Sequence, residues 1–156
     1  MTTTAQPARA EAATITPPRT TTSIGLLILR IVAGAVFAAH GAQKVFEFTL
    51  PGTVDAFTAM GAPLPAVTGP AIALLELVGG ALLILGVLTR PVALLLAADM
   101  VGAIALVHLP AGLWVDGGGV EFVAVLGAAA LALAFTGAGS VSGDRLLLRG
   151  RLRRFA

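Results

Sequence analysis

Seven ionisable side chains lie inside stretches of sequence that are otherwise apolar: Arg30, His40, Lys44, Glu76, Asp99, His108 and Glu121. A charge at the centre of a lipid-crossing helix costs about 2.5–3.5 kcal/mol on the insertion scale. Residues placed at that cost normally face a bundle interior or a wet cavity and pair with one another. These seven are therefore the first candidates for chemistry.

Five of the seven are predicted to gather in the outer half of the protein. Counting about 1.5 Å per residue from the helix ends places His40, Glu76 and His108 at one depth, with Lys44 and Glu121 at the rim. His40 and Lys44 are also neighbours on one helix face. Histidines beside carboxylates exchange protons near neutral pH. We predict a proton-exchanging pocket in which His40, Glu76 and His108 are the catalytic candidates.

The same count places Arg30 and Asp99 about 9–12 Å above the cytoplasmic edge, which predicts a structural ion pair between them. Asp99 and His108 fall on roughly opposite faces of an ideal helix, unless the last turn before Pro110 is unwound. The whole set could also serve only to fix which helices meet. No ligand spacing such as HxxxH or ExxH is present, so we predict no metal site; a haem between His40 and His108 is a weaker alternative.

The composition excludes a water-soluble globule. The 156 residues are 57% hydrophobic and 12% charged, and the mean hydropathy is +0.96, whereas soluble domains are about a quarter charged. Without cysteine the chain has no disulfide, thiolate metal site or iron–sulfur cluster of its own. Redox chemistry would need a bound cofactor or a partner. The net charge is only +2, and the basic residues crowd at the C-terminal end, so we expect no nucleic-acid partner.

Four apolar stretches must position the polar residues: Ile24–Phe46, Pro70–Leu88, Pro91–Leu109 and Val120–Thr136. About 20 apolar residues in a helix cross a bilayer, and only helices or closed barrels can do so. The second and third stretches are joined by little more than Thr89-Arg90, which forces an antiparallel hairpin. We predict an all-α integral membrane protein, an antiparallel four-helix bundle over residues 23–138, surrounded by membrane lipid.

The remaining segments are predicted to lie outside the bilayer. Residues 1–22 are rich in Thr, Ala and Pro and are expected to be a disordered tail. Residues 54–60 have helical spacing and suit a short surface helix between the first two helices, with an ordinary loop as the alternative. The basic tail, residues 139–156, fits either anionic headgroups or plain solvent. Arg30 argues against reading the first stretch as a cleavable signal peptide.

Charge asymmetry predicts the orientation. The arginines at positions 9, 19, 90 and 145 onwards flank one side, whereas Glu47, Asp55 and Asp116 lie in the opposite loops. The positive-inside rule then places both termini in the cytoplasm.

Several motifs occur in order at four-helix spacing: LRIVAGAVFAAHGAQKVF at 29–46, GAPLP at 61–65 and ELVGGALLILGVLTRP at 76–91. With the later Asp99, His108 and Glu121 they resemble the DoxX family over about residues 24–140. The resemblance implies a four-helix protein of the bacterial inner membrane, related to the DoxD subunit of thiosulfate:quinone oxidoreductase. It also implies association with soluble redox enzymes, superoxide dismutase and a sulfurtransferase in mycobacteria. The family's recurrent polar residues correspond to the seven residues above and Arg90.

The leading hypothesis is a membrane subunit of an oxidoreductase or antioxidant system that supplies a quinone or proton site and docks a soluble redox partner. Reduction of a quinone consumes protons, which a nearby histidine or glutamate can deliver. The alternatives are a small-solute or proton-coupled transport or binding protein, and a purely structural membrane scaffold. The sequence does not specify an oligomeric state.

Overall fold

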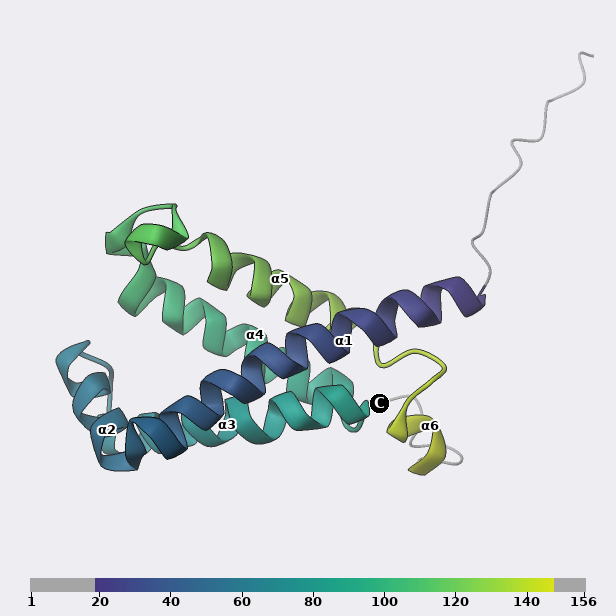
Figure 1. Ribbon diagram of the computed structural model, residues 1–156, viewed down its shortest axis with the longest axis horizontal. Coiled ribbons are helices and arrows are strands. Elements are labelled where there is room, and N and C mark those ends of the chain that lie inside the picture. Colours follow the sequence, from purple (N-terminus) through teal and green to yellow (C-terminus); the bar gives the residue numbers. More distant parts are fainter. Residues whose placement is uncertain (1–18, 148–156) are drawn as a thin grey trace, which may run out of the picture.

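The computed structural model describes residues 19–147, and this part of the chain is helical throughout, with short turns and no strand (Figure 1). Two of the helices end in a wider π-helical turn. In chain order the elements are α1 (Arg19–Ala42) with the π turn Gln43–Glu47, α2 (Thr49–Ala59), α3 (Pro65–Leu85), α4 (Thr89–Ala103) with the π turn Ile104–His108, the 3-10 turns Leu109–Ala111 and Val115–Gly117, α5 (Glu121–Thr136) and α6 (Gly143–Leu147).

Three helical segments are long and apolar enough to cross a membrane: Thr20–Glu47, Pro65–Leu85 and Thr89–Ala111. At about 1.5 Å per residue even the shortest, with 21 residues, reaches ~31 Å, the thickness of the hydrocarbon layer. α5 is also apolar but has only 16 residues. The prediction of an all-helical chain with apolar, membrane-spanning helices is confirmed.

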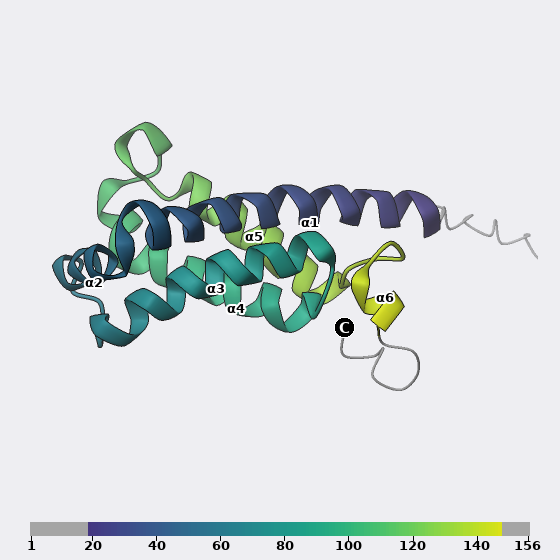
Figure 2. The same cartoon turned by 60° about the horizontal axis from the view of Figure 1, so that its bottom comes forward.

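The long helices pack as two pairs. α1 runs along α3 and α4 runs along α5, and the tight turn between α3 and α4 joins the pairs (Figures 1 and 2). Small residues let α1 and α3 approach closely: a Cβ atom added to Gly34 would lie 2.6 Å from the carbonyl oxygen of Gly80. In lipid, where apolar burial gives little driving force, such close backbone packing holds helices together.

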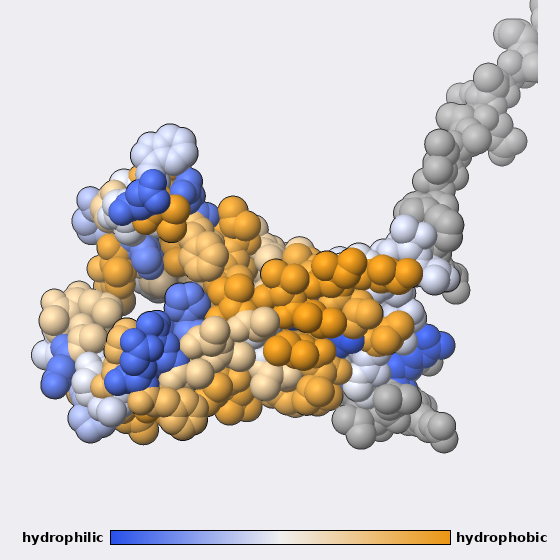
Figure 3. Space-filling model, in the orientation of Figure 1, coloured by the Kyte–Doolittle hydropathy of each residue, from blue (hydrophilic) through white to orange (hydrophobic). Residues whose placement is uncertain are grey.

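The molecule has two distinct ends, which we call the hairpin end and the α2 end. The hairpin end carries the α3–α4 turn and α6, and the α2 end carries α2 and the turns between α4 and α5 (Figure 2). Figure 3 shows hydrophobic residues over the middle of the visible face and hydrophilic residues gathered toward the ends. Between them, large side chains such as Phe37, Leu83, Leu96 and Leu133 fill the core.

Several predicted boundaries move. α1 begins at Arg19, so residues 19–22 of the predicted disordered tail are helical; residues 1–18 lie outside the described part. α3 begins at Pro65, and Pro70 lies inside it. The predicted surface helix falls within α2, which packs against α3 and the first π turn. Residues 143–147 form α6, and the rest of the basic tail, 148–156, lies outside the described residues.

Candidate functional site

A cavity of about 140 Å³ lies between the helices in the half of the molecule toward the α2 end. Four of the five residues predicted to form the outer pocket contribute to its wall. The lining residues are Phe37, His40, Lys44, Glu76, Met100, Ala103, His108, Phe122, Val123 and Leu126. The cavity thus combines an apolar wall with an ammonium, a carboxylate and two imidazoles.

Glu121, predicted at the rim, does not line this cavity. Its Oε1 atom accepts a hydrogen bond of 2.8 Å from the backbone N–H of Val115 and so ties the 3-10 turn to the start of α5. A carboxylate in the first helical turn also interacts favourably with the helix dipole. The structure therefore gives Glu121 a role in holding the turn that closes this end of the molecule.

The centre of the site is an ion pair between Lys44 and Glu76. Lys44 Nζ lies 2.5 Å from Glu76 Oε2, and the two side chains are 21% and 5% exposed. It is the one salt bridge within residues 19–147. Glu76 lies near the middle of α3, deeper than the sequence count placed it, because α3 begins five residues before Pro70. Removing one partner of such a pair leaves the other charge uncompensated away from water, which is strongly destabilising.

Asp99 belongs to the same group of charges. Across the α3–α4 turn, Asp99 on α4 lies almost level with Glu76 on α3. Asp99 Oδ2 is buried and meets no hydrogen-bond donor in the described structure. We call Lys44, Glu76, Asp99, His40 and His108 the central polar cluster.

The predicted Arg30–Asp99 ion pair is therefore wrong. Arg30 donates hydrogen bonds to the backbone carbonyls of Leu83, at 3.5 Å, and of Val141, at the hairpin end. The depth count failed because it started each helix from its own predicted end. Counted from the shared turn at Val87, Glu76 and Asp99 are almost equidistant, 11 and 12 residues away, so an antiparallel hairpin brings them level.

Sequence reasoning missed Asp144, which is buried at the hairpin end. Its carboxylate accepts hydrogen bonds from the backbone N–H groups of Leu88 (2.7 Å) and Thr89 (3.2 Å) at the start of α4, and its charge attracts Arg30. In the structure, α4 begins without a side-chain cap of its own. Uncapped N–H groups at a helix start need a partner from elsewhere.

The two histidines stand at the α2 end of the cavity. His108 Nδ1 lies 2.6 Å from the carbonyl oxygen of Gly118. Because a carbonyl oxygen can only accept, the proton must be on Nδ1, and Nε2 of the neutral ring is free to take up a proton. The His40 ring lies 6.2 Å from the ring of Phe122, centroid to centroid.

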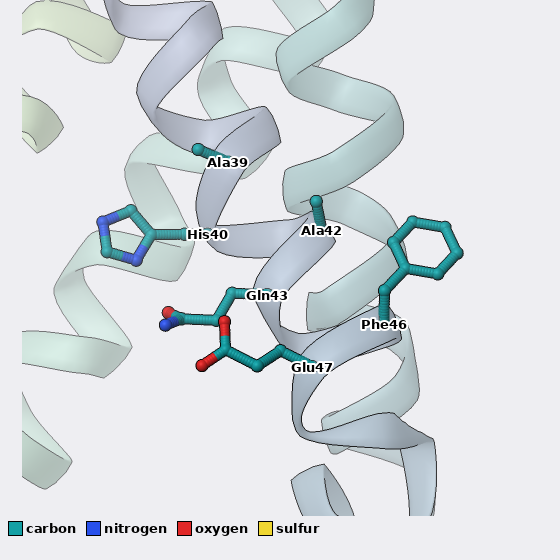
Figure 4. Close-up of a pocket in the computed structure, with 6 residues that line it drawn as sticks. All are labelled: Ala39, His40, Ala42, Gln43, Phe46 and Glu47. Carbon is teal, nitrogen blue, oxygen red and sulfur yellow. The ribbon is translucent and has the colours of Figure 1, made fainter.

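His40 also lines a second, more open groove of about 460 Å³, together with Ala39, Ala42, Gln43, Phe46 and Glu47. Figure 4 shows the side chains of His40, Gln43 and Glu47 on one side of the helix and Phe46 on the other. His40 is thus shared by the cavity and the groove.

Both π turns carry residues of the site. Lys44 lies in the turn Gln43–Glu47 and His108 in the turn Ile104–His108. The hydroxyl group of Thr53, on α2, donates a 2.8 Å hydrogen bond to the carbonyl oxygen of Lys44. On an ideal α-helix, His108 and Asp99 would fall on roughly opposite faces. The wider π turn changes the helical geometry at His108. π turns inside α-helices occur frequently at functional sites.

Comparison with known proteins identifies the family. The family model named DoxX matches residues 25–109, which include every member of the central polar cluster. The chain belongs to the DoxX family. It is a membrane protein, and the part that the family model matches holds the ionisable residues of the candidate site, whereas α5 completes the cavity wall.

Three relatives of this DoxX protein are informative. It is 36% identical over 128 residues to a Bacillus subtilis protein named "Putative oxidoreductase CatD", covering 82% of this chain and 90% of the relative. It is 31% identical to the inner membrane protein YphA of Escherichia coli, over 77% of this chain and 88% of the relative. The uncharacterized membrane protein Rv3486 of Mycobacterium tuberculosis is 36% identical over 55% of this chain and 52% of its own length. No solved structure matches the chain.

Proposed function

We propose that this DoxX protein is the membrane subunit of an oxidoreductase system and that its cavity binds the ring of a quinone and exchanges protons with it. The observation that carries the proposal is the position of a partly buried ammonium–carboxylate pair on the wall of a cavity of ring size. Burying charges in the middle of a membrane protein is costly and usually serves a function.

The dimensions of the cavity suit one six-membered ring. An apolar cavity of about 150 Å³ is known to hold benzene, and this cavity measures about 140 Å³. Phe37, Phe122 and Leu126 offer apolar surface to the faces of a ring, whereas Lys44 and His40 offer donors to its carbonyl oxygens. A quinone takes up two electrons and two protons to become a quinol.

The cavity residues can supply the protons but not the electrons. His108 and Glu76 can hold and pass protons, whereas the chain has no cysteine to carry electrons. The electrons would therefore come from a soluble redox enzyme that docks on the membrane protein. The name of the Bacillus subtilis relative as an oxidoreductase supports this class of function.

We also propose the finer topology: an antiparallel bundle of α1, α3, α4 and α5 in the bacterial inner membrane, with α2 along the outer surface and both termini in the cytoplasm. Arg90 and Arg145 lie at the hairpin end, and Asp55 and Asp116 lie toward the α2 end. The positive-inside rule favours a cytoplasmic hairpin end. Reporter fusions at residue 156 test this, since an external C-terminus would invert it.

Proton-coupled transport remains the main competing function, and the packing disfavours it. A transporter needs access to its site from both sides of the membrane. Here Leu83, Leu96 and Leu133 are fully buried in the half of the bundle between the cavity and the hairpin end. The groove that shares His40 with the cavity is lined by residues of α1 and its π turn, toward the α2 end, which fits a ligand site better than a pathway.

A filled cavity tests the proposal. Ala103 lines the cavity, whereas Ala105, two residues later, is exposed on the outside of the helix. We expect Ala103→Leu to lower the quinone that copurifies with the protein, measured by absorbance of extracted lipids, and the matched control Ala105→Leu to leave it unchanged. Equal quinone in both variants and the wild type would contradict a quinone in this cavity.

A further inference from the structure

A second hollow lies on the outside of the bundle, between α4 and α5, which pack side by side (Figure 1). We call it the α4–α5 groove. Its volume is about 480 Å³, and its lining consists of apolar residues alone. Leu94, Val101 and Leu131 on its walls are exposed, so the groove opens away from the core. Because α4 belongs to a segment long and apolar enough to cross the membrane, this opening meets lipid.

The groove and the cavity adjoin at Met100, which lines both. Consecutive residues next to this contact face opposite ways. Ala103 lines the cavity and Ile104 the groove, and on α5 Val123 lines the cavity and Ala124 the groove. The two spaces therefore lie back to back across the contact between α4 and α5, with the buried side chain of Met100 as the wall between them.

The wall at Met100 is adaptable. Methionine is unbranched and has three rotatable bonds, so its side chain adjusts to irregular surroundings. Gly127 on α5 leaves space beside it: a Cβ atom added to Gly127 would lie 3.0 Å from Met100 Cβ and 3.5 Å from Met100 Cγ. A movement of one flexible side chain can thus join the cavity to the groove.

We infer that the α4–α5 groove holds the isoprenoid tail of a quinone whose ring lies in the cavity, so that the ligand is a prenylated quinone of the membrane. The tail has a place here only if the ring binds in the cavity, so this site rests on the proposed function. The cavity, at about 140 Å³, has room for the ring alone. The tail must then lie outside it, in surroundings that keep hydrocarbon away from water.

The groove that His40 shares with the cavity suits such a tail less well. Gln43 and Glu47 line that groove, and a hydrocarbon chain against them would displace water from an amide and a carboxyl group. No polar side chain lines the α4–α5 groove. It extends along the helix from Ile104 to Leu94, about 15 Å at 1.5 Å per residue. A chain lying there stays within the hydrocarbon layer.

Binding of two quinones to the reconstituted full chain tests the inference. One carries an isoprenoid chain on a methoxylated benzoquinone ring, and the other has the same ring with a methyl group in place of the chain. Ala128 is exposed and lines the groove, whereas the matched control Ala105 is exposed and lines neither space. In Ala128→Leu the added side chain occupies the groove, so affinity for the prenylated quinone should fall about tenfold or more. Affinity for the tail-free quinone should not change, and Ala105→Leu should bind both quinones as the wild type does.

Other results overturn the inference in distinguishable ways. Unchanged affinity of Ala128→Leu for the prenylated quinone would show that the tail does not lie in the groove, while the ring site of the proposed function stands. An equal fall for both quinones would show that the substitution acts on the ring and would also overturn the tail site. If neither quinone binds to the wild type, the proposed function fails, and the tail site fails with it.

A second copy of the chain is the competing occupant of the groove, because small residues let helices pair closely in lipid. The sequence has no cysteine, so Ala128→Cys introduces a single thiol. On oxidation in the membrane we expect Ala128→Cys to form no more disulfide-linked dimer than Ala105→Cys does. A high yield of dimer through position 128 alone would show that a second copy fills the groove and would overturn the inference.

Discussion

Buried charge is handled in two different ways at two levels of this molecule. At the hairpin end, Arg30 and Asp144 each take two backbone groups as partners; we call this pair and the turn around it the hairpin-end polar cluster. In the central polar cluster, Lys44 and Glu76 are each other's partners and line a cavity. Side chains satisfied by backbone fix a fold, whereas side chains that depend on other side chains can change partners.

Burial alone does not distinguish the two clusters. Arg30, Asp144 and Glu76 are 3%, 4% and 4% exposed. What distinguishes them is the partner and the adjacent space. We expect substitutions at the hairpin end to reduce stability and substitutions in the centre to reduce function.

The largest effect is expected from Asp144→Ala. The change removes the acceptor for the N–H groups of Leu88 and Thr89 and the negative charge near Arg30. We expect a loss of about 3 kcal/mol in stability, since an uncompensated buried charge remains. Thermal unfolding in detergent measures it, with Asp116→Ala, in an exposed turn, as control. An unfolding midpoint equal to that of the control would show that Asp144 does not hold the hairpin.

The next effect is expected from Gly86→Ala. Gly86 has φ of +67°, and a Cβ atom there would collide with the Arg30 guanidinium group. The left-handed conformation alone costs about 1–2 kcal/mol for a residue with a side chain. We expect a stability loss of about 2 kcal/mol with quinone content per folded molecule unchanged. Gly25→Ala, where nothing lies within 4 Å of the added atom, is the matched control and should behave as wild type.

A smaller effect is expected from Thr53→Val. This substitution keeps the shape of the buried Thr53 but leaves the Lys44 carbonyl oxygen without its donor. A lost buried hydrogen bond costs about 1 kcal/mol. Because the bond supports the π turn that carries Lys44, quinone affinity should also fall. The control Thr58→Val, on the exposed face of α2, should change neither stability nor quinone affinity. An equal fall in both variants would show that the hydrogen bond from Thr53 to the π turn does not support the site.

The smallest effect on stability is expected from Asp99→Asn. Asp99 Oδ2 has no hydrogen-bond donor in the described structure, so the isosteric amide should replace the carboxyl group at a cost below about 1 kcal/mol. A loss of stability as large as that of Asp144→Ala would place Asp99 with the structural cluster instead.

Much of the fold could be predicted from the sequence, for physical reasons. Uninterrupted apolar runs indicate membrane helices directly, so α1, α3 and α4 were expected within a few residues of their observed positions. Their ends were less certain: α3 tolerates Pro70 inside its first turns, and Arg19–Thr22 join α1 although their composition suggests disorder.

The site was only partly predictable. Four residues were expected together because ionisable side chains inside a membrane pair with one another. The structure places all four on the wall of one cavity: His40, Lys44, Glu76 and His108. The predicted Arg30–Asp99 pair was wrong, because Arg30 bonds to backbone carbonyls at the hairpin end. The π turns and the Asp144 cap depend on contacts between segments far apart in the chain; Asp144 and Thr89, for example, are 55 residues apart. No local sequence pattern predicts such contacts.

The most direct test of the account compares folding and ligand binding in one variant, Glu76→Gln. Removing the Glu76 charge leaves Lys44 with Asp99 as counterion, so the protein should unfold within a few degrees of the wild type. Titration of the same purified samples with a short-chain quinone should show binding to the wild type and loss of binding to Glu76→Gln. Wild-type binding by the variant, or a collapse of its stability in step with binding, would contradict the claim that the central polar cluster serves a ligand rather than the fold.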